Sequence, residues 1–390
     1  MKTLIELYDE RPLENVLASQ VFLPERTLFL CPGDIKRNRH ITGSITSYLR
    51  GKGHSGDIRF YDTDMYDTRK IIETLNTLTG EYDGCVVDIT GGTDQALFAA
   101  GMVSAKKELA SFTYSRRRNA FFSVKDAPFG YTVPCELKLS VEDCFLMAGG
   151  SVRKGRVDNG ILGKYMNFFK PFFDVYMRFR TDWTNIVRYF QSTSAPKDGV
   201  ISLEIEAPYS VKADRGFVNV NAAALEALRK MGFLKDVSVT KEKVLYTFRD
   251  AQVRTWLRDI GSVLETYVYK VCTDMGIFDD VCTSVVVDWE GDGKQNNVTN
   301  ELDVMCSQGV TPVFISCKTC EIKTEALNEL SVLRDRFGGK MARAAIVSSS
   351  KCQAITRHRA EELDIAVIDL EDLRKNRLDD VLTTLMKPIA

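Results

Sequence analysis

Two neighbouring segments in the last third of the chain carry an acidic pair and a lysine. Glu301 and Asp303 alternate with apolar residues, so in a β-strand both carboxylates lie on one face. Ser316 and Lys318 share a face of the next segment for the same reason. The link between the segments is short and contains Gly309, which predicts an antiparallel hairpin. We therefore expect these polar side chains to lie close together on adjacent strands.

These residue types suit cleavage of a phosphodiester bond. Carboxylates hold Mg²⁺ or Mn²⁺, which stabilises the charge that develops on the phosphate, and a lysine orients or deprotonates the attacking water. We expect Asp303 to be the central metal ligand, Lys318 to position the water, and Glu265 on the preceding helix to be a further metal ligand. Glu301 and Ser316 complete the candidate catalytic set. From the spacing alone, the alternative is an exposed strand face held by salt bridges.

A second candidate site is a glycine-rich turn in the first third of the chain. Thr90, Gly91, Gly92 and Thr93 follow the strand-like run Cys85–Ile89 and precede a helical pattern. The glycines allow a close backbone approach, and the start of the helix offers unpaired N–H groups with partial positive charge. Such a turn suits an anion, for example a phosphate, although a tight turn that merely requires glycine explains the same residues. The turn has neither the Walker A lysine nor a G-x-G-x-x-G pattern, which disfavours generic NTP hydrolysis and dinucleotide binding.

Four further residues are expected to take part in ligand binding at this turn. Asp94 and Gln95 begin the helix that follows it. Glu10 and Arg11 lie in the loop after the first strand, which would open at the same edge of the sheet.

The elements around the turn predict a Rossmann-like α/β domain over residues 1–136. Apolar runs without interruption alternate with segments of helical length, which is typical of a parallel sheet covered on both faces. The expected strands are Thr3–Leu7, Thr27–Cys31, Ile58–Tyr61, Cys85–Ile89, Ala110–Tyr114 and Ala120–Val124. The expected helices are Leu13–Val21, Ile41–Leu49, Thr68–Leu78 and Ala96–Lys106.

The middle of the chain, residues 137–250, predicts a helical and winged-helix-like connector. Asn221 precedes a helical pattern that stops at a glycine, and a hairpin pattern follows it. Residues 164–190 combine ten aromatic residues with interleaved arginines. Such a stretch can stack on single-stranded nucleic acid, but we favour a buried packing face because aromatic residues are mostly core.

Residues 251–390 predict a second α/β domain. An apolar helical stripe over residues 257–271 is followed by strands at Val281–Trp289, Asn300–Cys306 and Pro312–Lys318. A long helix over Thr324–Phe337 and a further strand–helix–strand pattern complete it.

Composition excludes several classes of protein. The 390 residues contain 52 Lys and Arg against 53 Asp and Glu, a net charge of −1, which excludes a chain that holds nucleic acid by being basic throughout. The three histidines are far apart in the sequence, which excludes a His-rich zinc site and an H-E-x-x-H protease. No stretch approaches the ~18 apolar residues that span a membrane. The ten cysteines are scattered, so we expect free thiols and a cytoplasmic location.

The turn at Thr90-Gly91-Gly92-Thr93, after an apolar strand in an N-terminal Rossmann-like domain, resembles the CARF domains of type III CRISPR systems. The resemblance implies binding of a cyclic oligoadenylate at a dimer interface. Position 94 is Asp, where the family pattern often has Lys.

The helix Glu265, the strand Asp303 and the Lys318 at the end of the next strand resemble the PD-(D/E)xK nuclease superfamily. Ser316 stands where that motif has an acid, two residues before the lysine. Together the two halves resemble a CARF–PD-(D/E)xK ancillary nuclease. This resemblance implies a homodimer that degrades single-stranded RNA or DNA, with Mn²⁺ or Mg²⁺, once cyclic tetra-adenylate binds.

Two other hypotheses stay open at this point. One is a transcription regulator that responds to a cyclic oligoadenylate and uses the winged-helix-like connector. The other is a nuclease-like structural partner that Ser316 has made inactive.

Overall fold

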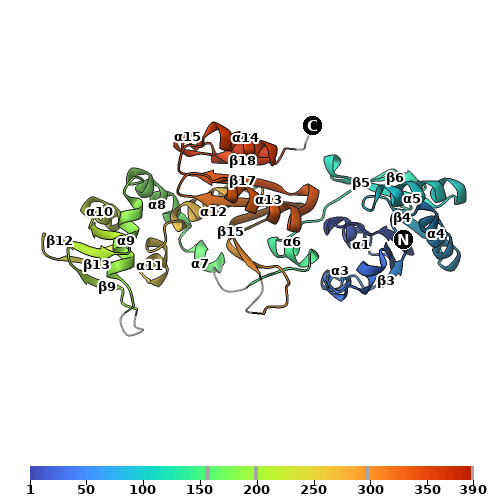
Figure 1. Ribbon diagram of the computed structural model, residues 1–390, viewed down its shortest axis with the longest axis horizontal. Coiled ribbons are helices and arrows are strands. Elements are labelled where there is room, and N and C mark those ends of the chain that lie inside the picture. Colours follow the sequence, from blue (N-terminus) through green and yellow to red (C-terminus); the bar gives the residue numbers. More distant parts are fainter. Residues whose placement is uncertain (154–158, 197–200, 295–297, 388–390) are drawn as a thin grey trace.

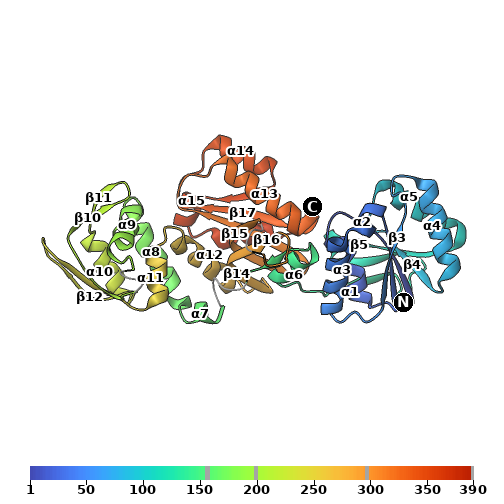
Figure 2. The same ribbon diagram turned by 60° about the horizontal axis from the view of Figure 1, so that its bottom comes forward.

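The computed structural model describes residues 1–153, 159–196, 201–294 and 298–387. Three units lie in a row, with the C-terminal unit between the other two (Figure 1). Figure 2 shows the same order from a second direction. Within the described ranges, every helix is too short or too polar to cross a membrane.

The N-terminal unit is built on a seven-stranded sheet with the order β3-β2-β1-β4-β5-β6-β7. The first five of these strands run parallel, and β6 and β7 are antiparallel additions. The strands are β1 (Thr3–Leu7), β2 (Arg26–Cys31), β3 (Asp57–Asp62), β4 (Cys85–Asp88), β5 (Ala110–Ser115), β6 (Ala120–Lys125) and β7 (Thr132–Pro134). The helices are α1 (Leu17–Phe22), α2 (Gly33–Arg37), α3 (Arg39–Gly51), α4 (Thr68–Glu81) and α5 (Asp94–Lys107), with 3-10 turns η1 (Leu13–Asn15) and η2 (Arg116–Arg118).

Helices cover both faces of this sheet. One buried cluster joins α1 and α3 to the sheet, and another joins α4 and α5 to it. The predicted parallel sheet with two covered faces is therefore confirmed. Strand order reverses between β1 and β4, and open α/β sheets bind ligands at such a switch point, beyond the carboxyl ends of the strands.

The unit farthest from the N-terminal domain contains most of the middle segment. Its three-stranded sheet has the order β12-β13-β9, and β10 and β11 form a separate hairpin. The predicted capped helix is α10, whose N-cap Asn221 accepts a hydrogen bond from the Ala224 N–H, and the predicted hairpin is β12–β13. The elements are α7 (Asn159–Gly163), α8 (Met166–Arg178), α9 (Trp183–Thr193), β9 (Glu204–Ala207), β10 (Ser210–Ala213), β11 (Gly216–Asn219), α10 (Ala222–Lys230), β12 (Leu234–Val239), β13 (Val244–Phe248) and α11 (Ala251–Leu257).

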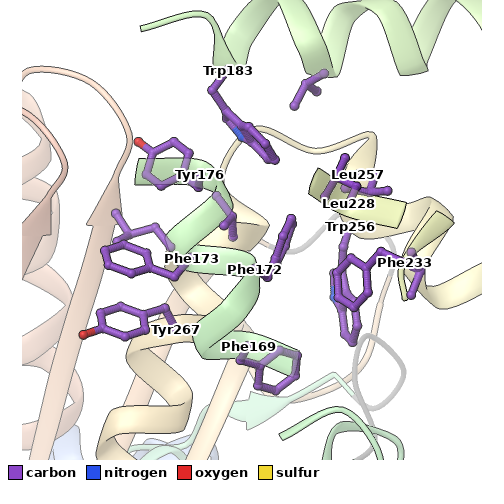
Figure 3. Close-up of a cluster of buried hydrophobic side chains, with 14 of the residues drawn as sticks. Phe169, Phe172, Phe173, Tyr176, Trp183, Leu228, Phe233, Trp256, Leu257 and Tyr267 are labelled. Atoms are coloured by element: carbon purple, nitrogen blue, oxygen red, sulfur yellow. The ribbon is translucent and has the colours of Figure 1, made fainter. Parts of the chain in front are cut away.

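The aromatic stretch of this unit forms a packing face. Phe169, Phe172 and Trp183 are buried, and Phe173 stacks on Tyr267 with ring centroids 3.8 Å apart (Figure 3). These rings fasten α8 to the C-terminal domain. The prediction that these aromatic residues form a buried packing face is thus confirmed, and they do not form a stacking surface for nucleic acid.

The C-terminal unit is a six-stranded sheet with the order β18-β17-β16-β15-β14-β8. The predicted hairpin is present as the antiparallel pair β15–β16, and β16, β17 and β18 are parallel. Strand β8 pairs with β14, so the segment around α6 and β8, which the sequence analysis assigned to the middle of the chain, packs with this sheet. The strands are β8 (Ser151–Val152), β14 (Asp280–Asp288), β15 (Thr299–Gln308), β16 (Thr311–Lys318), β17 (Arg343–Ser348) and β18 (Ile365–Ile368). The helices are α6 (Val141–Met147), α12 (Ser262–Asp274), α13 (Thr324–Gly338), α14 (Ala354–Glu362), α15 (Leu370–Arg374) and α16 (Leu378–Leu385), with the 3-10 turn η3 (Gly339–Met341).

The N-terminal and C-terminal domains share one continuous buried cluster. It includes Phe29 of β2, Phe145 of α6 and Phe337 of α13. The rings of Phe145 and Phe337 pack edge to face with centroids 5.1 Å apart. Lys52, directly after α3, forms an ion pair with Asp143 of α6, with 2.7 Å between Nζ and Oδ1. Helix α6 is therefore one of the contacts through which the two domains pack together.

Candidate active site and ligand pocket

Asp303 sits where the hairpin strands β15 and β16 separate. The backbone pairing between the strands runs as far as Val304 and Ile315 and stops there. Beyond that point, Asp303 Oδ2 accepts the Cys317 N–H at 2.6 Å and the Ser316 hydroxyl at 3.1 Å. The Asp303 carboxylate thus accepts a backbone N–H that would otherwise bond to the neighbouring strand, at the point where the two strands separate.

Lys318 ends β16 beside this carboxylate. Its Nζ lies 3.6 Å from Asp303 Oδ2, so both residues face one site, as the alternation predicted. Burial raises the pKa of the Asp303 carboxyl above its ordinary value, although the Lys318 charge and the hydrogen bonds from Cys317 and Ser316 oppose this shift.

Glu265 joins the site from the first turn of α12. Burial, together with the negative charges of Asp303, Asp259 and Glu301, raises the pKa of Glu265 to about 8, while Lys318 acts in the opposite direction. A Cβ atom on Gly261 would come within 2.5 Å of Glu265 Oε1, so glycine at this position leaves room for the carboxyl group. The predicted catalytic residues are thereby brought within electrostatic reach of one another.

The donor set fits a hard divalent cation. Asp303 raises the pKa of Glu265, and Glu301 raises that of Asp303, so a positive ion at this site would relieve repulsion. The described residues contain no group of three or more His, Cys, Asp or Glu arranged to hold a metal. Mg²⁺ and Mn²⁺ are usually bound by one or two carboxylates and keep several waters, unlike zinc. Asp303 and Glu265 would therefore hold the ion, with the Ser316 hydroxyl beside it.

Several residues that support the site were not predicted from the sequence. Asp259, just before α12, accepts hydrogen bonds from the Ser262 N–H at 2.8 Å and the Ser262 hydroxyl at 2.6 Å. Tyr176 and Arg180 reach from the middle unit to Ser349, whose N–H donates to the Lys318 carbonyl at 3.0 Å. The hydrogen-bond partners of Tyr176 and Arg180 are distant in sequence, so these contacts could not have been recognised beforehand. Only the local Asp-x-x-Ser spacing at 259–262 carries such a signal.

The ligand pocket forms at the switch point between β1 and β4. After β1, Asp9 accepts hydrogen bonds from Arg11 Nε at 2.6 Å and Nη2 at 2.5 Å. Asp9 Oδ2 also accepts the Gly92 N–H at 2.9 Å. Burial alone would raise the pKa of Asp9, but these donors hold it below its ordinary value. The loop after β1 is thus tied to the glycine turn after β4, as the shared sheet edge predicted.

Both glycines of the turn are required by close approaches. A Cβ on Gly92 would lie 2.8 Å from Leu7 Cβ, and the φ of Gly92 is +107°. A Cβ on Gly91 would lie 3.0 Å from Asp9 Cβ. Thr93 caps α5 by accepting the Ala96 N–H at 3.2 Å, and Thr93 donates to the Met65 carbonyl at 2.5 Å. The turn therefore has a fixed geometry.

The predicted ligand residues divide into two groups around a cavity of about 610 Å³. Glu10, Arg11, Gly92 and Thr93 line it. Thr90, Gly91, Asp94 and Gln95 do not line it: Thr90 donates to Asp88 and accepts the Tyr114 N–H at 2.8 Å, Gly91 is buried, and the other two residues are exposed at the start of α5. The cavity is also lined by Tyr8, Asp9, Pro32, Asp34, Ile35, Met65, Tyr66 and Lys340.

Comparison with known proteins identifies the C-terminal domain. Residues 252–385 match the family model described as the Card1-like endonuclease domain, which supports a nuclease enzyme. No curated protein sequence is similar enough to this chain to be a match.

Two solved structures share the fold along the whole chain. VC1899 from Vibrio cholerae is 18% identical, with a TM-score of 0.73, and the match covers 99% of this chain and 98% of that chain. Can2 from Sulfobacillus thermosulfidooxidans, solved in complex with cyclic tetra-adenylate, is 15% identical, with a TM-score of 0.72 and 99% coverage of both chains. The resemblance to a CARF–nuclease ancillary protein is thus confirmed by the endonuclease domain and by the fold, which is that of Can2.

Proposed function

We propose that this protein is a metal-dependent endonuclease that cyclic tetra-adenylate activates, and that it degrades single-stranded RNA or DNA in antiviral defence. The observation that carries the proposal is the convergence of Asp303, Lys318 and Glu265 in a domain that matches an endonuclease family model. A cytoplasmic location belongs to the same proposal, since all ten cysteines are free thiols.

Each residue of the candidate active site has a role in hydrolysis of a phosphodiester. A bound Mg²⁺ or Mn²⁺ supplies Lewis acidity at the phosphate. Asp303 and Glu265 are the carboxylates that would hold it. The Lys318 ammonium orients the attacking water and offsets the negative charge on the pentacoordinate phosphorus centre. The water oxygen bonds to phosphorus as one water proton passes to solvent, the bond between phosphorus and the leaving oxygen breaks, and the leaving oxygen takes up a proton from solvent. Ser316 keeps Asp303 oriented through its hydroxyl.

Ligand binding is proposed at the cavity beside the glycine turn. The N-terminus of α5 offers backbone N–H donors to phosphate oxygens, and Gly92 and Thr93 beside it line the cavity. The complex of Can2 with cyclic tetra-adenylate supports the choice of ligand, because that chain shares the fold over its whole length.

The proposal includes a homodimer. Helix α5 exposes Phe98 and Met102 on one face, with 66% and 48% of their surface accessible, and Tyr66 next to the cavity is 70% exposed. Apolar surface of this kind beside the pocket suits a second copy of the chain. A cyclic ligand would then bind across two equivalent cavities.

Incubation of the protein with cyclic oligoadenylates of different ring sizes, scoring cleavage of single-stranded RNA and DNA with Mn²⁺, tests the function. We expect cleavage that requires both the metal and cyclic tetra-adenylate. Tight binding to a duplex without cleavage would instead favour a transcription regulator. Absence of any cleavage would favour an inactive nuclease-like partner.

A further inference from the structure

One residue in the ligand cavity comes from the nuclease domain. Lys340 lies in η3, directly after α13, yet it lines the cavity with Glu10, Arg11 and Thr93 of the N-terminal domain. A contact next to it fixes this arrangement: a Cβ on Gly339 would lie 3.6 Å from the Cβ and Cγ atoms of Arg11. The end of α13 therefore packs against the loop that carries Arg11.

The charged residues that line the cavity include more acidic than basic side chains. Asp9, Glu10 and Asp34 are acidic, and the basic residues are Arg11 and Lys340. Arg11 is committed to Asp9 by two short hydrogen bonds. Among the described residues, Lys340 has no ion pair, and its side chain is exposed.

The glycine turn itself brings no cation to a phosphate. Its helix begins with Asp94, which is exposed and negatively charged. A phosphodiester ligand in this cavity would therefore meet backbone N–H groups and three carboxylates, and among the residues that the structure describes Lys340 is the one lining cation that is not already paired.

We propose that Lys340 binds a phosphate of the activating cyclic oligonucleotide, and that the nuclease domain thereby contacts the activator directly. The proposal rests on the proposed function, because it assigns a further residue to the same ligand site. An ammonium on a phosphate forms a charge-assisted hydrogen bond, which is among the stronger polar contacts in proteins.

This contact would connect the two sites through one helix. Helix α13 begins at Thr324, shortly after Lys318 at the end of β16, and it ends at Gly338 beside Lys340. Its 15 residues span about 22 Å at 1.5 Å per residue. A ligand that binds Lys340 together with the N-terminal domain stabilises the arrangement in which both meet.

Equilibrium binding of labelled cyclic tetra-adenylate to the full-length chain tests the assignment, with K340A, K340R and R117A compared to the wild type. Arg117 is the matched control because it lines a second cavity that Lys340 also borders, but not the ligand cavity. We expect K340A to weaken binding about tenfold or more, and K340R to stay within about threefold of the wild type. R117A should bind as the wild type does.

The concentration of cyclic tetra-adenylate that gives half-maximal cleavage should rise in K340A by the same factor. Thermal melting of K340A near the wild-type temperature would show that an exposed side chain was changed without damage to the fold. Wild-type binding in K340A, or an equal loss in R117A, overturns the assignment of Lys340 while the proposed function survives. Failure of the wild type to bind any cyclic oligoadenylate overturns both.

Discussion

At the residue scale, the site depends on carboxyl groups that are held in an unfavourable environment. Glu265 and Asp303 are half-buried, and both have raised pKa values. Burial of these groups is unfavourable in the charged form and becomes favourable when a cation is shared between them. The first two predictions test this electrostatic balance without reference to cleavage.

The Glu265 carboxyl should make metal-free stability depend on pH. Its pKa is about 8 in the folded state against an ordinary 4.5, so between these values the folded protein keeps a proton that the unfolded chain releases. Stability from this group is complete below about pH 4.5 and is lost as the pH rises towards 8. Melting in EDTA should therefore show that E265Q gains on the wild type between pH 5 and 8, and that the gain levels off above pH 8.

The control for this measurement is E325Q, at an exposed glutamate of α13. Its melting curve should follow the wild type at every pH. Parallel pH profiles for E265Q and the wild type would contradict the raised pKa of Glu265.

Ser316 offers a second test of the same balance. Its hydroxyl donates to Asp303 Oδ2 at 3.1 Å, so S316D would replace a donor by a third carboxylate. We expect S316D to melt below the wild type in EDTA, because like charges repel, and to gain more than the wild type on addition of Mn²⁺. Titration of the melting temperature with Mn²⁺ measures this difference.

S316A is the matched control, since it removes the donor without adding a charge. It should lose stability in EDTA but show the wild-type response to Mn²⁺. An equal Mn²⁺ response in S316D and the wild type would argue against a metal at this position.

At the element scale, the aromatic face of α8 holds the middle unit on the nuclease domain. Phe173 stacks on Tyr267, which belongs to the same helix as Glu265 (Figure 3). Helix α8 thus packs against the helix that carries Glu265, a candidate metal ligand.

Truncation of this contact should be costly. We expect F173A to destabilise the protein by about 3–5 kcal/mol, as for other buried phenylalanines, in equilibrium unfolding with urea. The control F217A changes a side chain that is 76% exposed and should stay within about 0.5 kcal/mol of the wild type. A loss in F173A as small as that in F217A would show that this contact contributes little to the fold.

Periodicity predicted most of the elements because they bury their apolar faces locally. The strand Thr3–Leu7 matches β1, and Asn221 caps α10 as expected. The alternation of polar and apolar residues also predicted that Asp303 and Lys318 lie at one site. It did not predict how the strands are arranged there. The strands separate at Asp303, and the Asp303 carboxylate bonds to a backbone N–H that regular pairing would have used.

Contacts between distant segments could not be predicted in this way. Strand β8 is only two residues long, so its sequence carries no alternation, and its place beside β14 becomes visible only in the folded chain. Lys340 likewise follows an ordinary helix end, and nothing local indicates that the ligand cavity lies across the domain contact.

At the scale of the whole molecule, the nuclease domain lies between the sensing domain and the middle unit (Figure 1). The N-terminal and C-terminal domains share a buried cluster, so under the proposed function packed side chains, rather than a flexible linker, would carry a change from the ligand cavity to the nuclease domain. Activation by a dimer additionally requires a contact between two sensing domains.

The exposed face of α5 should form that contact. F98E places a charge in the centre of the apolar face, where burial against a second copy would cost several kcal/mol. We expect F98E to be monomeric, by light scattering, at concentrations where the wild type is a dimer. V124E, at an exposed valine of β6, is the control and should remain dimeric, whereas an undisturbed F98E dimer would exclude this face.

The most direct test of the account is cleavage of single-stranded nucleic acid by the wild type, D303N and K318A, each with Mn²⁺ and cyclic tetra-adenylate. We predict activity in the wild type that EDTA abolishes, and a loss of about 100-fold or more in both variants, while E325Q keeps wild-type activity. Activator binding should be unchanged in D303N, because Asp303 lies outside the ligand cavity. Wild-type cleavage rates in D303N or K318A would contradict the account.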